Sequence, residues 1–204
     1  MEKSYVPKKF SYWLAPISGY EDQKGRYHPA TVLPNCETDV ARVAYMLRND
    51  EALKKQTERV RYFTDAAEFR QAKARLLPYI TPFGVFSKRD SQSIKTYSGL
   101  VPIDLDKAED GLDLEEAKQW IFENNAPYVK LAFISPSGRG IKLLVDVGNR
   151  IIEWDERLHE EFFAAVSESV ALDFGEEMLK VDHVGKDLAR ACFLCHDPTA
   201  LWRE

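Results

Sequence analysis

Two carboxylates stand at the end of an apolar run, Leu100-Val101-Pro102-Ile103-Asp104-Leu105-Asp106. In a β-strand, residues i and i+2 point to the same face, so Asp104 and Asp106 are predicted to project together. Adjacent carboxylates repel each other unless a cation lies between them, and divalent metals bind such pairs of oxygen ligands. The pair alone is also compatible with a strand that ends in a solvated turn, because the polar residues 107–111 follow it.

A second candidate for chemistry is the segment Ser135-Pro136-Ser137-Gly138-Arg139-Gly140-Ile141-Lys142. Its glycines permit a tight turn whose backbone N–H groups can face an anion. Arg139 and Lys142 add positive charge of the kind that binds phosphate. The segment lacks the spacing of a Walker loop and of a dinucleotide fingerprint, and an ordinary surface hairpin has the same composition.

A third carboxylate, Asp182, follows the apolar Val181, and the basic residue Arg190 lies a short distance beyond it. This segment is also typical of a polar surface loop. Asp187 and Asp197 are the alternatives for the third carboxylate, and the apolar residue before Asp182 favours Asp182.

The elements that must position these residues indicate an α/β (α+β) fold. Apolar spacing predicts a helix over 37–49 that buries Val40, Val43, Ala44 and Leu47. Further helices are predicted over 65–76, after a capping Asp113, and along the stripe Trp154, Leu158, Phe162, Val166 and Val170. Strands are predicted at 60–63, 100–106, 178–182 and 191–195, with a hairpin formed by 129–135 and 140–147.

Composition limits the possible classes of protein. The chain has 204 residues, 45% of them hydrophobic, which suits one soluble domain. A net charge of −5 argues against a protein that coats nucleic acid. Without a signal peptide or a membrane-length apolar run, the expected location is the cytoplasm. The run Cys192-Phe193-Leu194-Cys195-His196 spells a haem-attachment pattern, but its strand-like character predicts buried cysteines instead.

Taken in order, the three motifs resemble the archaeo-eukaryotic primase (AEP) superfamily, of the primase-polymerase type. That family has an apolar strand ending in Asp-x-Asp, then a Ser-Gly turn ending in a basic residue, then a third Asp followed by another basic residue. Residues 97–106 and 187–198 more narrowly resemble the N-terminal domain of VirE-type replication proteins of bacterial mobile elements. In those proteins the domain precedes a helicase-like ATPase.

The resemblance implies one domain, with residues 1–36 as an N-terminal extension and 37–204 as a catalytic core. This core would contain a mixed sheet of the RRM-like type, flanked by helices, with an N-terminal α/β unit. The chain would then be a DNA primase/polymerase-like nucleotidyltransferase, and could be the front of a longer protein. Its partners would be nucleoside triphosphates, a single-stranded or primed DNA template, and a helicase-like ATPase in the same or another chain, with no membrane.

The resemblance also assigns roles to residues. Asp104, Asp106 and Asp182 would be catalytic and would hold Mg²⁺ or Mn²⁺. The triphosphate would contact Ser137, Gly138, Arg139, Gly140, Lys142 and Arg190. Lys142 stands where the family usually has histidine, which leaves open a degenerate nucleotide- or DNA-binding module that recruits a helicase. A sugar-nucleotide transferase, which also uses Asp-x-Asp, is a third possibility.

For the template strand, the candidates are Lys88, Arg89 and Lys95, which are interleaved with Phe83, Phe86 and Tyr97. Cations for phosphates and rings for bases are typical of grooves that bind single strands. A solvated loop beside a few core aromatics would have the same sequence.

Overall fold

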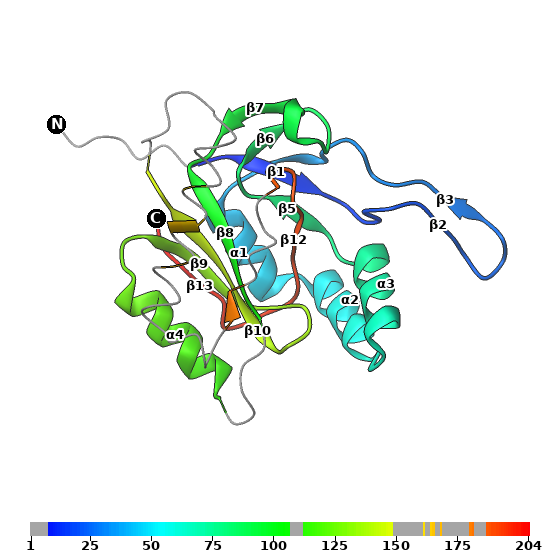
Figure 1. The fold of residues 1–204 in the computed structure, drawn as a ribbon. Coiled ribbons are helices and arrows are strands. Elements are labelled where there is room, and N and C mark those ends of the chain that lie inside the picture. The colour runs from blue at the N-terminus through cyan, green and yellow to red at the C-terminus, as the bar shows by residue number, and fades with distance from the viewer. Residues whose placement is uncertain are drawn as a thin grey trace.

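The computed structural model describes residues 8–106, 112–148, 161, 164–165, 168, 180–181 and 187–204. Over these residues the fold is mixed α+β, with four α-helices and several antiparallel sheets (Figure 1). The apolar stripe that predicts a helix from Trp154 to Val170 lies outside the described residues. None of the helices within the described ranges is long and apolar enough to cross a membrane.

One sheet contains strands from both ends of the chain. Its order is β12 (Cys192–Phe193), β5 (Tyr79–Thr81), β1 (Phe10–Trp13) and β4 (Cys36–Thr38). The side chain of Trp13 is fully buried, and its ring stacks on Tyr79 with centroids 5.8 Å apart. The indole nitrogen of Trp13 donates to the hydroxyl of Thr81 at 3.1 Å, which satisfies the polar atom of a buried aromatic residue. The β1 strand is therefore a central part of the core.

The second sheet carries the candidate motifs. Its order is β11 (Lys180–Val181), β8 (Leu100–Asp106), β10 (Gly140–Asp146), β9 (Val129–Ile134) and β13 (Leu201–Trp202), with every pair antiparallel. Helix α4 (Leu114–Asn124) connects β8 to β9 in the chain, while β10 lies between these strands in the sheet. The predicted hairpin of β9 and β10 is confirmed, as is the Asp113 cap, which accepts from the Glu115 and Glu116 N–H groups.

Three further helices lie against this framework: α1 (Val40–Asn49), α2 (Glu51–Arg61) and α3 (Ala66–Leu76). The buried face predicted for the first helix is confirmed, since Val40, Val43, Ala44 and Leu47 are its buried residues. The predicted strand at 60–63 is wrong. Val60 is the third member of a helical stripe that begins with Leu53 and Thr57, and these are the buried residues of α2.

The five-stranded sheet has a hydrophobic cluster on each face. On one face, Leu100 and Leu144 belong to a cluster with α1, α2 and α3. On the other, Ile103 and Leu143 belong to a cluster with Ile121 of α4.

The described part of the fold also contains two small hairpins. One is formed by β2 (Tyr20–Glu21) and β3 (Tyr27–His28). The other is formed by β6 (Gly84–Phe86) and β7 (Ile94–Tyr97), which are joined through the 3₁₀ turn η1 (Ser91–Ser93). The β2–β3 hairpin projects from the body of the protein on the side of α3 (Figure 1).

Candidate functional site

The two carboxylates of β8 lie on one face of the strand, as its alternation predicts. Asp104 is half-buried and Asp106 exposed, whereas Ile103 and Leu105 are each only 1% exposed. This pattern is typical of a strand whose opposite face packs in a core. Asp104 and Asp106 therefore share the face of the sheet that carries Leu100.

The pairing of β8 with β10 brings the first two motifs together. Lys142 lies opposite Asp104, and Gly140 lies opposite Asp106. The ammonium group of Lys142 forms an ion pair with Oδ1 of Asp104. The segment that ends the glycine turn is thus a direct neighbour of the carboxylates, 38 residues away in sequence.

Gly140 is required by this close approach of the two strands. A Cβ atom at this position would lie 2.3 Å from the carbonyl oxygen of Leu105, which real Cβ atoms do not tolerate. The obstacle is backbone of the paired strand, so it cannot move without disturbing the ladder that carries Asp104 and Asp106.

We therefore expect Gly140→Ala to lower the free energy of unfolding by about 1–3 kcal/mol, the usual cost of forcing extra volume into a packed site. Urea denaturation followed by circular dichroism measures this change. Arg139→Ala, at the exposed neighbouring position, is the control and should change stability by less than about 0.5 kcal/mol. Equal stability of the Gly140→Ala variant and the parent would contradict the argument.

Lys142 is a buried cation. Burial alone would lower its pKa, but the charges of Asp104 and Asp106 and the hydrogen bond to Asp104 outweigh that effect and raise the pKa above its usual value. Lys142 is accordingly charged at neutral pH. It neutralises part of the carboxylate pair without any bound metal.

Lys73 of α3 is a member of the site that the sequence analysis missed. Burial, the charge of Lys142 and the charge of Arg190 lower the pKa of Lys73, whereas Asp104 and Asp106 act in the opposite direction. Its ammonium nitrogen lies 5.1 Å from the centroid of the Phe193 ring and 5.8 Å from that of Phe69. No local sequence signal marks Lys73, because only the packing of α3 against β12 brings it here.

Arg190 belongs to the same group of charges. It precedes β12 and is half-buried, and its charge acts on both Lys73 and the Cys192 thiol. Burial raises the pKa of Cys192 to about 11, so this thiol is neutral at physiological pH. The prediction of buried cysteines in the Cys192–Cys195 run is confirmed, since both are buried and free.

The glycine turn is held in place by a helix. The guanidinium of Arg61, the last residue of α2, donates to the carbonyl oxygens of Pro136 at 3.1 Å and Ser135 at 3.2 Å. Gly138 adopts φ +71°, a conformation that favours glycine. Its N–H donates to the Ser135 carbonyl, and the Arg139 N–H donates to the Ser137 hydroxyl. These two N–H groups are used inside the turn, while the Arg139 side chain is exposed.

The candidates for the third carboxylate have different environments. Asp182 lies outside the described residues, and the two residues before it form β11, which pairs with β8 at Asp106 and Leu105. Asp197 forms a buried ion pair with Lys118, with 3.0 Å between Nζ and Oδ2. Asp187 accepts from the Ser91 hydroxyl at 2.8 Å. Asp197 is thus held by a structural ion pair.

The three template candidates also differ from one another. Arg89 turns inward: one nitrogen donates to the Ile17 carbonyl at 2.9 Å, and the guanidinium lies 6.0 Å from the Tyr79 ring centroid. Lys88 is exposed and forms an ion pair of 3.1 Å with Asp90. Lys95 is exposed on β7. Arg89 therefore joins the β6–β7 region to the loop after β1.

The described residues thus define a mixed α+β protein with a charged site on one face of a five-stranded antiparallel sheet. A family model for the BT4734-like, N-terminal domain matches residues 71–202, which include both β8 and β10. The chain belongs to this family. No curated protein and no solved structure matched the chain.

Proposed function

We propose that this chain is a metal-dependent nucleotidyltransferase, a DNA primase/polymerase-like domain that acts in the replication of a mobile element. The observation that supports it is the pairing of β8 with β10. This pairing puts two carboxylates beside a basic turn and beside Lys142. A site that transfers nucleotides needs carboxylates for a metal and cations for phosphate oxygens within one small volume.

The topology of the sheet supports the proposed fold. The strands β8 and β9 are connected through α4 and have β10 between them, while β11 lies on the other side of β8. This is the split β-α-β arrangement of sheets of the RRM-like type. Such a sheet is what the resemblance to the primase-polymerase type implies.

The donor set suits a hard divalent cation. Carboxylate oxygens of the kind that Asp104 and Asp106 supply are the ligands that Mg²⁺ and Mn²⁺ prefer. Lys142 engages one oxygen of Asp104, and the carboxylate has a second. The described part of the chain contains no group of three His, Cys, Asp or Glu side chains placed to hold a metal. Asp182 is the third ligand of the proposal.

The protein's own contribution is to bind and orient. Mg²⁺ or Mn²⁺ at Asp104, Asp106 and Asp182 would neutralise phosphate charge and acidify the attacking 3′-hydroxyl. Lys142, Lys73 and Arg190 would attract the triphosphate, and Arg139 would reach it from the exposed turn beside Ser137, Gly138 and Gly140. In this scheme catalysis comes from positioning and fixed charge, with no covalent intermediate on the protein.

The direct test is incorporation of labelled dNTPs and NTPs on single-stranded and primed templates, with Mg²⁺ or Mn²⁺. Metal-dependent product is the expected result, and the reactive nucleotide identifies the preferred sugar. If no product forms although nucleotide still binds, the nucleotidyltransferase proposal fails.

One observation favours a second candidate, a nucleotide- or DNA-binding module that recruits a helicase. The Lys142 ammonium is already bound to Asp104 and partly satisfies the carboxylate pair. In such a module the cations would still hold a triphosphate, whereas metal binding at Asp104 would be weakened.

Substitution at position 142 separates the two candidates. Lys142→His should keep nucleotide incorporation at the parent's level or raise it by up to about tenfold. Imidazole is mostly neutral above its ordinary pKa of about 6.5. The charge of Asp104 would therefore remain available to a metal. Steady-state incorporation at pH 8 measures the effect. Lys142→Met is the comparison, since it removes the cation without providing imidazole. Nucleotide binding without turnover in the parent and in Lys142→His would instead support the module.

A further inference from the structure

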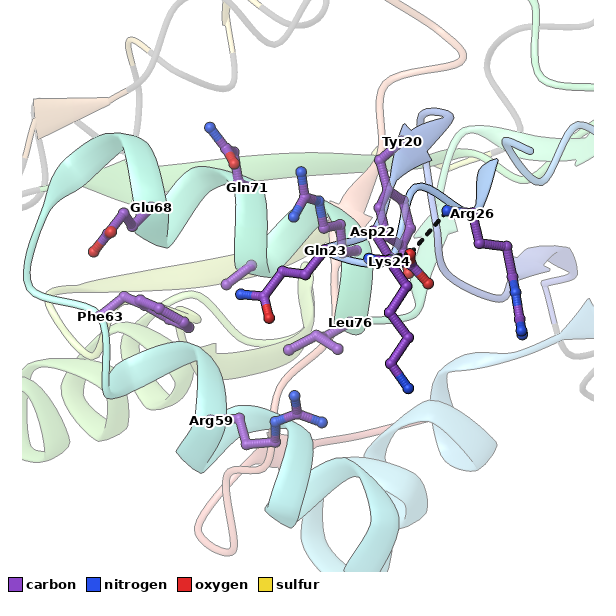
Figure 2. A pocket seen from close by; sticks show the side chains of 12 residues that line it. Tyr20, Asp22, Gln23, Lys24, Arg26, Arg59, Phe63, Glu68, Gln71 and Leu76 are labelled. Carbon is purple, nitrogen blue, oxygen red and sulfur yellow. Dashed lines mark hydrogen bonds between the residues drawn. The ribbon is translucent and has the colours of Figure 1, made fainter. Parts of the chain in front are cut away.

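A pocket of about 650 Å³ lies between the β2–β3 hairpin and the helices α2 and α3. Figure 2 shows side chains from these elements around one space, with Lys24 extending from the hairpin and Arg59 from α2. None of the predicted site residues that the structure describes lines it. It is thus distinct from the site on the sheet.

The pocket is basic within an acidic protein. Its lining includes Lys24, Arg26, Arg59 and Arg75, against the acidic Asp22 and Glu68. The helical segment 51–76 carries seven Lys and Arg residues against four Asp and Glu residues, although the whole chain has a net charge of −5. A local excess of positive charge in an acidic chain is the electrostatic mark of a surface that binds a polyanion.

Asp22 helps to build the hairpin that forms one wall. Its carboxylate accepts from the Lys24 and Arg26 N–H groups, both at 2.9 Å, and lies 3.1 Å from the His28 ring nitrogen. The hydrogen bond with His28 is the main reason that the pKa of Asp22 is lowered. This acidic residue therefore shapes the turn that presents Lys24 and Arg26.

Aromatic rings accompany the cations. The Tyr20 ring stacks on His28 with centroids 4.7 Å apart, and the Arg75 guanidinium lies 4.5 Å from the Tyr20 centroid. At the end of α2, Phe63 lines the pocket with 36% of its surface exposed, and the adjacent Tyr62 is 83% exposed. Cations for the backbone and exposed rings for the bases are the two components of a groove that binds single strands.

Helix α3 connects the pocket with the site on the sheet. Ala72 and Arg75 line the pocket, whereas Lys73 between them is the residue whose pKa responds to Asp104 and Asp106. A strand held in the pocket would lie against the helix that supplies a cation to the carboxylates.

We propose that this pocket binds a single strand of DNA, an inference that rests on the proposed function because the strand would be the template. The backbone phosphates contact Lys24 and Arg59, and Phe63 stacks on a base. Lys24 and Arg59 belong to different elements, so the strand bridges the hairpin and α2.

The test is the affinity of the full chain for a fluorescent oligo(dT), measured by anisotropy over a series of salt concentrations. Lys24→Glu/Arg59→Glu should weaken binding by at least about tenfold. It should also lower the slope of log affinity against log salt by about 1.4, since each phosphate contact to a single strand contributes about 0.7. Phe63→Leu should weaken binding by at least about fivefold through lost stacking.

Lys54→Glu/Lys55→Glu is the matched control, because it makes the same change in charge on α2 at two residues that do not line the pocket. Circular dichroism confirms that each variant is folded. Equal weakening by the pocket and control variants would overturn the proposal, since it would mean that overall charge alone decides. If Lys24→Glu/Arg59→Glu lost mononucleotide binding but kept oligo(dT) binding, the proposal would also be overturned.

The two proposals can fail separately. If the parent incorporates no nucleotide but binds oligo(dT) in a manner that depends on Lys24 and Arg59, the nucleotidyltransferase proposal fails and the pocket proposal stands. If the parent incorporates nucleotide but its affinity for oligo(dT) is independent of both residues, the reverse holds.

Discussion

Asp106→Asn is expected to lower metal-dependent nucleotide incorporation by roughly 10²- to 10³-fold, the usual cost of removing one charge-stabilising group from a polar active site. Asparagine keeps the shape of the side chain but removes the negative charge that holds a divalent cation. Asp106 is exposed, so the substitution should change the free energy of unfolding by less than about 0.5 kcal/mol. Single-turnover incorporation with saturating Mn²⁺ and saturating nucleotide separates this chemical loss from weaker binding of the metal or the nucleotide.

Two comparisons make this prediction specific. Glu123→Gln on the exposed face of α4 removes a carboxylate from a helix that packs on the other face of the sheet from Asp104 and Asp106, and should leave incorporation within about twofold of the parent. Asp104→Asn should abolish incorporation and also destabilise the protein, because it removes the charged partner of the buried Lys142. Full activity of Asp106→Asn would exclude this carboxylate from the reaction.

Asp197→Ala is expected to lower the free energy of unfolding by about 3–5 kcal/mol, the usual cost of removing one partner of a buried ion pair. The Lys118 and Asp197 side chains are 1% and 2% exposed. Oδ2 of Asp197 also accepts from the Ile134 N–H at 2.8 Å, so the carboxylate connects α4 to β9. Chemical denaturation followed by tryptophan fluorescence measures the change.

Asp187→Ala is the matched control for this substitution. Asp187 and Asp197 each accept from the N–H group two residues further on, at 3.0 Å in both cases, but Asp187 is exposed. Its loss removes two hydrogen bonds, from the Ala189 N–H and the Ser91 hydroxyl, and should cost about 1–2 kcal/mol. Similar costs for the two variants would show that the buried ion pair contributes little.

The same ion pair predicts a dependence of stability on pH. Burial would raise the pKa of Asp197, but the hydrogen bond from the Ile134 N–H and the charge of Lys118 outweigh this effect and lower the pKa below its usual value. A lowered pKa in the folded state adds stability at pH values above the pKa of the unfolded chain, and this stability is lost as the pH falls through the folded pKa. The Asp197→Ala variant should therefore differ most from the parent at neutral pH and least in strong acid.

The parts of the fold that sequence patterns predicted are the local ones. Alternation in 100–106 gave the correct faces of β8, because burial on one side of a strand leaves a period of two. Asp65 and Asp113 marked the starts of α3 and α4, because an aspartate at the N-cap satisfies free N–H groups. The helix predicted over 37–49 begins only at Val40, because residues 36–38 pair with β1 and Asp39 is the cap.

The parts that could not be predicted depend on tertiary packing. The pattern predicts a strand at Val60 because its apolar neighbours form a short run, whereas its helical partners Leu53 and Thr57 are separated by polar residues. Lys73 gains its role only because α3 packs beside β12. The pocket is lined by a hairpin of two-residue strands, which leaves too little periodicity for a prediction.

The position of β1 has a practical consequence for how this family should be divided into fragments. The family model begins at residue 71, so a fragment cut at that boundary would lack β1, β4, α1 and α2. Strand β5 would lose one of its two neighbours, and Tyr79 would lose the ring of Trp13. Expression trials and deletion maps of this protein should therefore start upstream of β1, since the segment that the family model matches is smaller than the folded unit.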